Sequence, residues 1–151
     1  INARLTIENM EFKSLIGSLS NGKIDLIAAG MTVTDERKKE VDFTEKYFTA
    51  NQKIIIPVGD PIKSAADLKG KVVGVQEGTT GDLIVSEDEV DVKEYNVKEV
   101  KRYKKGIDAV MDLINGRIDA ELSFLTAIAY SSVSMPLSMA TILPSFDDTY
   151  S

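Results

Sequence analysis

The residues best suited to chemistry lie in one short stretch, AGMTVTDER, at residues 29–37. Gly30 allows a backbone to approach a ligand closely, and Thr32 offers both a hydroxyl and an N–H group. Arg37 falls one turn into an expected helix, and its planar guanidinium suits two parallel hydrogen bonds to a carboxylate. The stretch therefore predicts a carboxylate site, although its last residues also suit an ordinary charged helix surface.

A second candidate is the turn QEGTTGD at residues 76–82, between an expected strand and an expected helix. Gly78, Thr79 and Thr80 would present N–H groups and two hydroxyls to an anion. The turn lacks the Gly-Lys-Ser/Thr ending of a nucleotide-binding P-loop. A third candidate is Phe12, at the start of an expected helix, whose alternative role is in the core.

The composition excludes several chemistries. The sequence contains no cysteine and no histidine, which removes disulfides, thiolates and the commonest general base and metal ligand. The acidic clusters at 86–91 and 146–148 lack the spacing of a calcium loop, so they read as solvated turns. We expect no cofactor, no metal and no catalytic residue.

The overall charge and hydropathy are those of a globular domain, with 43% hydrophobic and 28% charged residues. No run of 18 apolar residues predicts a membrane span. The net charge of −6 argues against nucleic acid as a partner, because binding its phosphates requires clustered Lys and Arg.

Two expected helices are followed by nearly the same pentapeptide, NGKID at 21–25 and NGRID at 115–119. In each, the Asn-Gly pair ends the helix and the Ile-Asp pair opens a strand. Apolar residues repeat at i, i+3, i+4 and i+7 before both copies, and these predicted core faces are Phe12, Leu15, Ile16 and Leu19, then Ile107, Val110, Met111 and Ile114. We also expect strands at 4–8, 24–30, 52–57, 71–75, 92–103 and 118–122, a helical turn at 34–40 and helices from 64 and 82. This alternation predicts an α/β fold.

Three segments together resemble a known family. NGKIDLIAAGMTVTDERKKEVDFTEKYF, DLKGKVVGVQEGTTGD and NGRIDA, in this order, are similar to the polar amino-acid branch (family 3) of the periplasmic solute-binding proteins of ABC importers. The resemblance runs from about residue 7 to residue 120. It implies a type II, two-lobe binding-protein fold, with a partial lobe 1 at 1–57, a first hinge strand at 52–57, lobe 2 at 58–140 and a return crossing at 141–151. We expect the first lobe to be truncated.

The resemblance also implies how a ligand would be held. Thr32 and Arg37 would hold the α-carboxylate from the first lobe, and Thr79 and Thr80 from the second. The Gly30 carbonyl would receive the ammonium group. Phe12 would pack against the ligand and Gln76 would lie near its side chain. The full expected ligand-binding set is Phe12, Gly30, Met31, Thr32, Arg37, Gln76, Gly78, Thr79, Thr80 and Phe124.

One position departs from the family pattern. The family usually has an acid where this sequence has Phe124, and that acid pairs with the ligand ammonium. Such a charge-assisted bond contributes about 1.5–3 kcal/mol, so the ligand is either not an ordinary α-amino acid or is bound more weakly. Glu121 or Ser123 could substitute only if the strand register turns it toward the ligand.

The resemblance implies non-catalytic capture of a small amino-acid-like solute, with closure of the lobes as the signal to a membrane permease. The expected partners are the ligand and the ABC permease. The expected location is extracytoplasmic, in the periplasm or at the cell surface on a lipid anchor. Two alternatives are a ligand-sensing domain of a receptor and, less favoured, a same-fold dehydratase, for which only Glu77 and Glu121 could act as acid or base.

Overall fold

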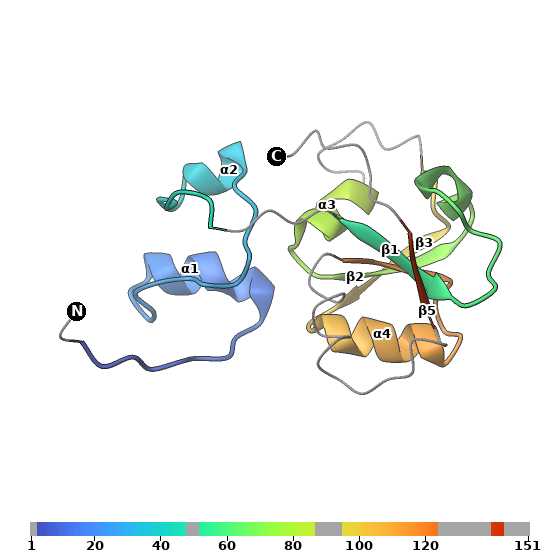
Figure 1. The fold of residues 1–151 in the computed structure, drawn as a ribbon. Helices are drawn as coiled ribbons and strands as arrows, with labels where there is room; N and C mark the ends of the chain where they lie inside the picture. The colour runs from blue at the N-terminus through green and yellow to red at the C-terminus, as the bar shows by residue number, and fades with distance from the viewer. Residues whose placement is uncertain (1–2, 48–51, 87–94, 124–139, 144–151) are drawn as a thin grey trace.

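The computed structural model describes residues 3–47, 52–86, 95–123 and 140–143 (Figure 1). We call residues 3–47 the N-terminal segment and the remaining described residues the sheet unit. The N-terminal segment contains the 3₁₀ helix η1 (Phe12–Ser14) and the helices α1 (Leu15–Ser20) and α2 (Asp35–Lys38). It lies beside the sheet unit, at the left of Figure 1.

Helix ends in the N-terminal segment follow local chemistry. The helix α1 ends at Ser20, and Gly22, two residues later, has a φ of +66°, the left-handed conformation that glycine adopts without steric cost. Thr34 caps α2, because its Oγ1 accepts a hydrogen bond from the Arg37 backbone N–H at 3.2 Å. The helix end at Asn-Gly was predicted, and the structure confirms it.

The strands predicted at 4–8 and 24–30 are wrong. Both stretches are irregular, and Leu5, Ile7 and Leu26 expose 83%, 84% and 67% of their surface. A strand needs a neighbour to receive its backbone hydrogen bonds. Among the described residues, no strand lies beside either stretch, so their apolar pattern has nothing to pair with.

The sheet unit is built on five strands in the order β3-β2-β4-β1-β5. Their bounds are β1 (Lys53–Pro57), β2 (Val72–Gln76), β3 (Glu99–Tyr103), β4 (Ala120–Ser123) and β5 (Ala140–Leu143). β2 runs parallel to β3 and β4, whereas β1 runs antiparallel to β4 and β5. The strands predicted at 52–57, 71–75 and 118–122 are confirmed, with bounds that shift by one or two residues. The strand predicted at 92–103 is confirmed only over β3; residues 95–98 are turn or irregular, so the prediction is wrong there, and residues 92–94 lie outside the described residues.

Helices cover both faces of this sheet. The connecting helices are η2 (Ala65–Leu68), α3 (Thr80–Val85) and α4 (Gly106–Ile114). Side chains alternate along β1, so Ile54 and Ile56 join the core cluster that includes Leu68 and Val85, while Ile55 joins the cluster beneath α4. The α/β prediction is therefore confirmed. The limits predicted for the two lobes remain a prediction.

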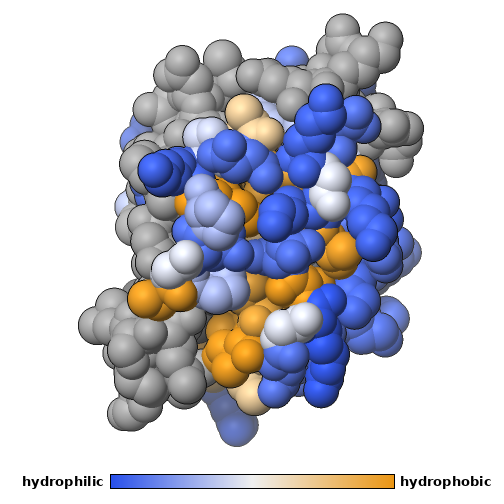
Figure 2. Space-filling model, turned by 90° about the vertical axis from the view of Figure 1, so that its right-hand side faces the viewer, coloured by the Kyte–Doolittle hydropathy of each residue, from blue (hydrophilic) through white to orange (hydrophobic). Residues whose placement is uncertain are grey.

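The buried face of α4 differs from the predicted one. Ala109, Val110 and Leu113 are buried, whereas Ile107 and Met111 expose 38% and 47% of their surface. The helix approaches the sheet at Gly74, where an added Cβ would lie 3.5 Å from the Ala109 Cβ. Because the helix lies so close to the sheet here, the small side chain of Ala109 fits against the sheet, and the larger Ile107 and Met111 side chains lie at the surface. Figure 2 shows apolar surface among the mostly hydrophilic residues of one face of the molecule.

Candidate functional site

Arg37 occupies the centre of the candidate site. Its side chain folds back over the loop before α2, and Nη1 donates to the Thr32 carbonyl at 2.7 Å. Nη2 donates to the Gly78 carbonyl, on the sheet unit, at 2.9 Å. Only 8% of the residue is exposed. The guanidinium thus has a fixed plane at the junction of the N-terminal segment and the sheet unit.

Phe12 packs against this guanidinium. The Arg37 Cζ lies 5.7 Å from the centre of the Phe12 ring, and Phe12 is buried. A cation over an aromatic face is stabilised by about 0.5–2 kcal/mol, depending on its solvation. Phe12 is therefore buried as predicted and borders the candidate site, while its packing against a ligand stays a prediction.

The turn after β2 faces Arg37 from the other side. Gly78 has a φ of +78°, and Thr79 caps α3, its Oγ1 accepting from the Asp82 N–H at 3.4 Å. The same hydroxyl donates to the Gln76 carbonyl at 2.8 Å. Thr79 and Thr80 are both buried. The predicted Gly-Thr-Thr turn therefore joins a strand to a helix as expected.

A group of hydroxyls gathers beside Arg37. The Oγ1 atoms of Thr32 and Thr80 are 3.3 Å apart, within hydrogen-bond distance. Gln52, which the sequence analysis did not include, donates from Nε2 to the Thr80 Oγ1 at 2.8 Å. Its only sequence signal is a polar residue immediately before the apolar strand β1. The structure thus brings together Phe12, Thr32, Arg37, Gly78 and Thr80 from segments far apart in the sequence.

Other predicted residues lie at the margin of this group. Gly30 has a φ of +60°, and its N–H donates to the Tyr47 hydroxyl at 3.2 Å. Met31 is partly exposed. Gln76 turns toward the connection between β3 and α4, where its Nε2 donates to the Lys104 carbonyl at 3.3 Å. The structure therefore does not bring Gln76 onto the guanidinium.

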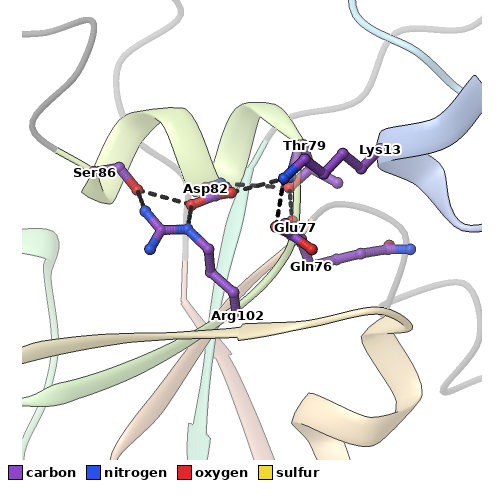
Figure 3. A network of polar contacts seen from close by, with 8 residues as sticks. Lys13, Gln76, Glu77, Thr79, Asp82, Ser86 and Arg102 are labelled. Atoms are coloured by element: carbon purple, nitrogen blue, oxygen red, sulfur yellow. Dashed lines mark hydrogen bonds and ion pairs between the residues drawn. The ribbon is translucent and has the colours of Figure 1, made fainter. Parts of the chain in front are cut away.

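The two sequence neighbours of Phe12 each form an ion pair with the sheet unit: Lys13 supplies the positive charge of one pair, and Glu11 supplies the negative charge of the other. Lys13 Nζ lies 2.7 Å from Glu77 Oε1 (Figure 3), and Lys104 Nζ lies 3.0 Å from Glu11 Oε1. The hydrogen bond to Glu11 raises the pKa of Lys104 above its usual value. Each pair joins the N-terminal segment to the sheet unit, so the charges specify how the two parts meet.

The strand β4 (Ala120–Ser123) leads to the position where the family usually has an acid. Phe124 lies outside the described residues. Glu121 is fully buried in β4, opposite Ile55 and Gly74. Ile55 belongs to the cluster beneath α4, so Glu121 belongs to the α4 face of the sheet. Whether it substitutes for the missing acid stays an open prediction.

The described part of the chain shows neither a metal site nor a membrane-spanning helix. No group of three or more Asp or Glu side chains there has a geometry that could hold a metal ion. None of its helices has the length and hydropathy of a membrane span.

Comparison with known proteins gives matches along most of the chain. Residues 1–126 match the model of the bacterial extracellular solute-binding proteins, family 3. The L-arginine-binding protein of Pseudomonas aeruginosa is 43% identical over 111 residues, which are 73% of this chain and 41% of that protein. The chain spans about half the length of the curated relatives it matches.

Solved structures agree with the sequence matches. An ancestral arginine-binding protein bound to arginine has a TM-score of 0.79 and 42% identity, covering 90% of this chain and 59% of that one. An ancestral arginine-binding protein bound to glutamine has a TM-score of 0.78 and 39% identity, covering 92% and 60%.

Proposed function

Because this chain belongs to family 3 of the bacterial extracellular solute-binding proteins, we propose that it captures a small L-amino acid without altering it chemically. The family predicted from the sequence is confirmed, and so is the binding-protein fold, of which the chain spans a part. The names of its relatives make arginine and glutamine the first ligands to test.

The observation that carries this proposal is the convergence of Arg37, Thr32 and Thr80. The hydroxyls of Thr32 and Thr80 lie within hydrogen-bond distance of each other, and the buried Arg37 guanidinium bonds the Thr32 and Gly78 carbonyls beside them. Together these groups supply a positive charge and hydrogen-bond donors in one place. A planar carboxylate is the ligand group that matches a guanidinium fork. In this proposal the ligand carboxylate binds between Arg37 and the two threonines, and Phe12 packs against the rest of the ligand.

The ammonium group of the ligand requires acceptors on the same side. We assign this role to the Gly30 carbonyl, whose left-handed backbone conformation is available to glycine without strain. The resemblance supports this assignment. Phe124, which stands in the sequence where the family usually has an acid, carries no charge, so in this proposal the carboxylate contacts contribute more of the affinity than they would beside such an acid.

Binding at this junction would favour one arrangement of the protein. A ligand that contacts both Thr32 and Thr80 binds the joined state more tightly than a parted one, and so shifts the population toward it. We propose that the closed, loaded form then engages the membrane permease of an ABC importer. The location proposed is extracytoplasmic, in the periplasm or on a lipid anchor at the cell surface.

A thermal-shift experiment tests the proposed ligand class. L-arginine, L-glutamine and the other standard amino acids are compared with agmatine, which is arginine without its carboxylate. A ligand at 100 times its Kd adds about 2.7 kcal/mol to the stability of the folded state, which raises the Tm of a chain this long by about 5–10 °C. We expect at least one amino acid to give this shift and agmatine to give none.

Two results would contradict the proposal. One is a panel in which no amino acid changes the Tm. The other is an equal shift with agmatine and arginine, which would remove the carboxylate from the recognition. Mass spectrometry of the recovered ligand checks that it is released unchanged, as non-catalytic binding requires.

A further inference from the structure

A buried carboxylate lies directly behind the candidate carboxylate site. Asp82 is in the first turn of α3 and exposes only 6% of its surface. Its Oδ2 accepts from the Gly78 N–H at 3.0 Å. Its Oδ1 accepts from the Ser86 hydroxyl at 2.8 Å and from the Arg102 Nε at 2.9 Å. Figure 3 shows these side chains as one connected network.

Arg102 reaches this carboxylate from β3, a strand that contributes no residue to the predicted site. In addition to the bond to Asp82, its Nη2 donates to the Ser86 hydroxyl at 2.6 Å. The pair is held from two directions, since Ser86 bonds both partners. A bond network of this kind fixes side-chain geometry more firmly than an isolated surface pair does.

The network ends on the same residue that Arg37 holds. Arg102 bonds Asp82, Asp82 accepts from the Gly78 N–H, and the Gly78 carbonyl accepts from the Arg37 Nη2. The position of Gly78 therefore determines where one arm of the Arg37 guanidinium lies. A change at Arg102 would reach the site through these bonds.

The charges lead to the same conclusion. An uncompensated Asp82 carboxylate near Thr79 and Thr80 would repel an incoming ligand carboxylate, because like charges interact strongly where water is excluded. The positive charge of Arg102 compensates it. Arg102 therefore has two effects on an anion at this site: it fixes the turn and it neutralises the charge behind it.

We propose that Arg102 is a positioning residue for carboxylate binding, acting through Asp82 and Gly78; this inference rests on the proposed function. Arg102 touches no ligand in this arrangement. Its contribution is to keep the Gly-Thr-Thr turn in the conformation that receives the carboxylate, with no net negative charge behind it.

The test measures the Kd for L-arginine by calorimetry in the unaltered chain and in Arg102→Met. We expect the variant to bind about tenfold more weakly. Lys101→Met is the matched control: it removes one positive charge from the neighbouring position of β3, where Lys101 pairs with Asp112 at 3.7 Å. That control should bind within twofold of the unaltered chain.

A rescue distinguishes positioning from general stabilisation. In Arg102→Met, the additional change Asp82→Asn removes the uncompensated charge, while the amide oxygen can still accept from the Gly78 N–H. The double variant should recover most of the lost affinity, and Arg102→Lys should lie between Arg102→Met and the unaltered chain. A structural role alone would lower the Tm of Arg102→Met and leave the Kd of its folded fraction unchanged.

The outcomes separate the inference from the function on which it rests. If the unaltered chain binds L-arginine and Arg102→Met binds it equally well, the inference is wrong and the proposed function stands. If Asp82→Asn gives no recovery, the charge argument fails. If the unaltered chain binds neither L-arginine nor any other amino acid, the proposed function fails, and the inference fails with it.

Discussion

Arg37 and Gly78 are 41 residues apart in the sequence, and the Arg37 Nη2 donates to the Gly78 carbonyl at 2.9 Å. This bond joins the N-terminal segment to the sheet unit through two residues of the candidate site. In the proposed site, this bond fixes the orientation of the guanidinium for as long as Gly78 keeps its position. The effect of changing Arg37 can be measured as a loss of ligand affinity, and the effect of changing Gly78 as a loss of stability.

Replacing Arg37 by Met keeps much of the side-chain length and removes the charge. Two charge-assisted hydrogen bonds contribute about 1.5–3 kcal/mol each, and about 1.4 kcal/mol is a factor of ten in Kd. We therefore expect the affinity for L-arginine to fall by at least about a hundredfold in calorimetry. Lys38→Met, which alters an exposed neighbour paired with Asp35, should bind normally. Binding by Arg37→Met within threefold of the unaltered chain would exclude Arg37 from the site.

Gly78→Ala should destabilise the fold more than Gly22→Ala does. Both residues have positive φ values, which cost other residues about 1–2 kcal/mol. An added Cβ at Gly78 would also lie 3.2 Å from the Lys13 Cα, whereas nothing lies within 4 Å at Gly22. Urea unfolding of the two variants checks the difference. Equal losses would show that the contact with Lys13 adds nothing to the strain of the backbone.

The sequence predicts those parts of the site that depend on local chemistry. The Thr34 cap places Arg37, and a strand followed by Gly-Thr-Thr gives the turn that faces it. These features are decided within a few residues, so spacing reveals them. The apolar run from Val72 to Val75 likewise predicts a buried strand whatever its neighbours are.

Features that depend on distant partners could not be predicted in this way. The strands expected at 4–8 and 24–30 have suitable composition, but no described strand lies beside them. The bond from Gln52 to Thr80 spans 28 residues, and that from Arg102 to Asp82 spans 20. Nothing in the spacing of these residues connects them, since the pairing arises only when the strand order brings them together.

The ion pair between Lys13 and Glu77 should be exchangeable. Lys13→Glu or Glu77→Lys alone places like charges within a few ångströms of each other, and the exchanged double variant restores the attraction. Partly exposed pairs contribute about 0.2–1 kcal/mol, so we expect each single variant to lose about that much stability and the double variant to recover it. Unfolding measurements at low salt and at 1 M salt check the origin, because the Debye length falls to about 3 Å at 1 M. Additive losses in the double variant would contradict a direct interaction.

The stability of the sheet unit should depend on Asp67 at acidic pH. Hydrogen bonds from the Lys63 N–H and from the Ser64 hydroxyl and N–H hold the pKa of Asp67 below its ordinary value of 3.8. A carboxyl with a lowered pKa in the folded state contributes stability above the unfolded pKa of about 3.9, and this contribution is lost as the pH falls through the lower folded value. Urea unfolding at pH 3 and pH 7 should therefore show a smaller pH dependence in Asp67→Asn. An unchanged pH dependence would show that other carboxyl groups govern the acid response.

The position of β1 in the sheet has a mechanical consequence. The chain leaves the N-terminal segment after residue 47 and enters the sheet unit at β1, which is bonded on both sides, to β4 and to β5. A force that pulls the N-terminal segment along the direction of β1 loads both ladders in shear, because the interstrand bonds stand perpendicular to the strands. Shear requires many bonds to break together, whereas a strand peeled from an edge releases them one at a time. Tension applied through the start of β1 is therefore resisted by both ladders together, unlike tension on a strand at the edge of the sheet.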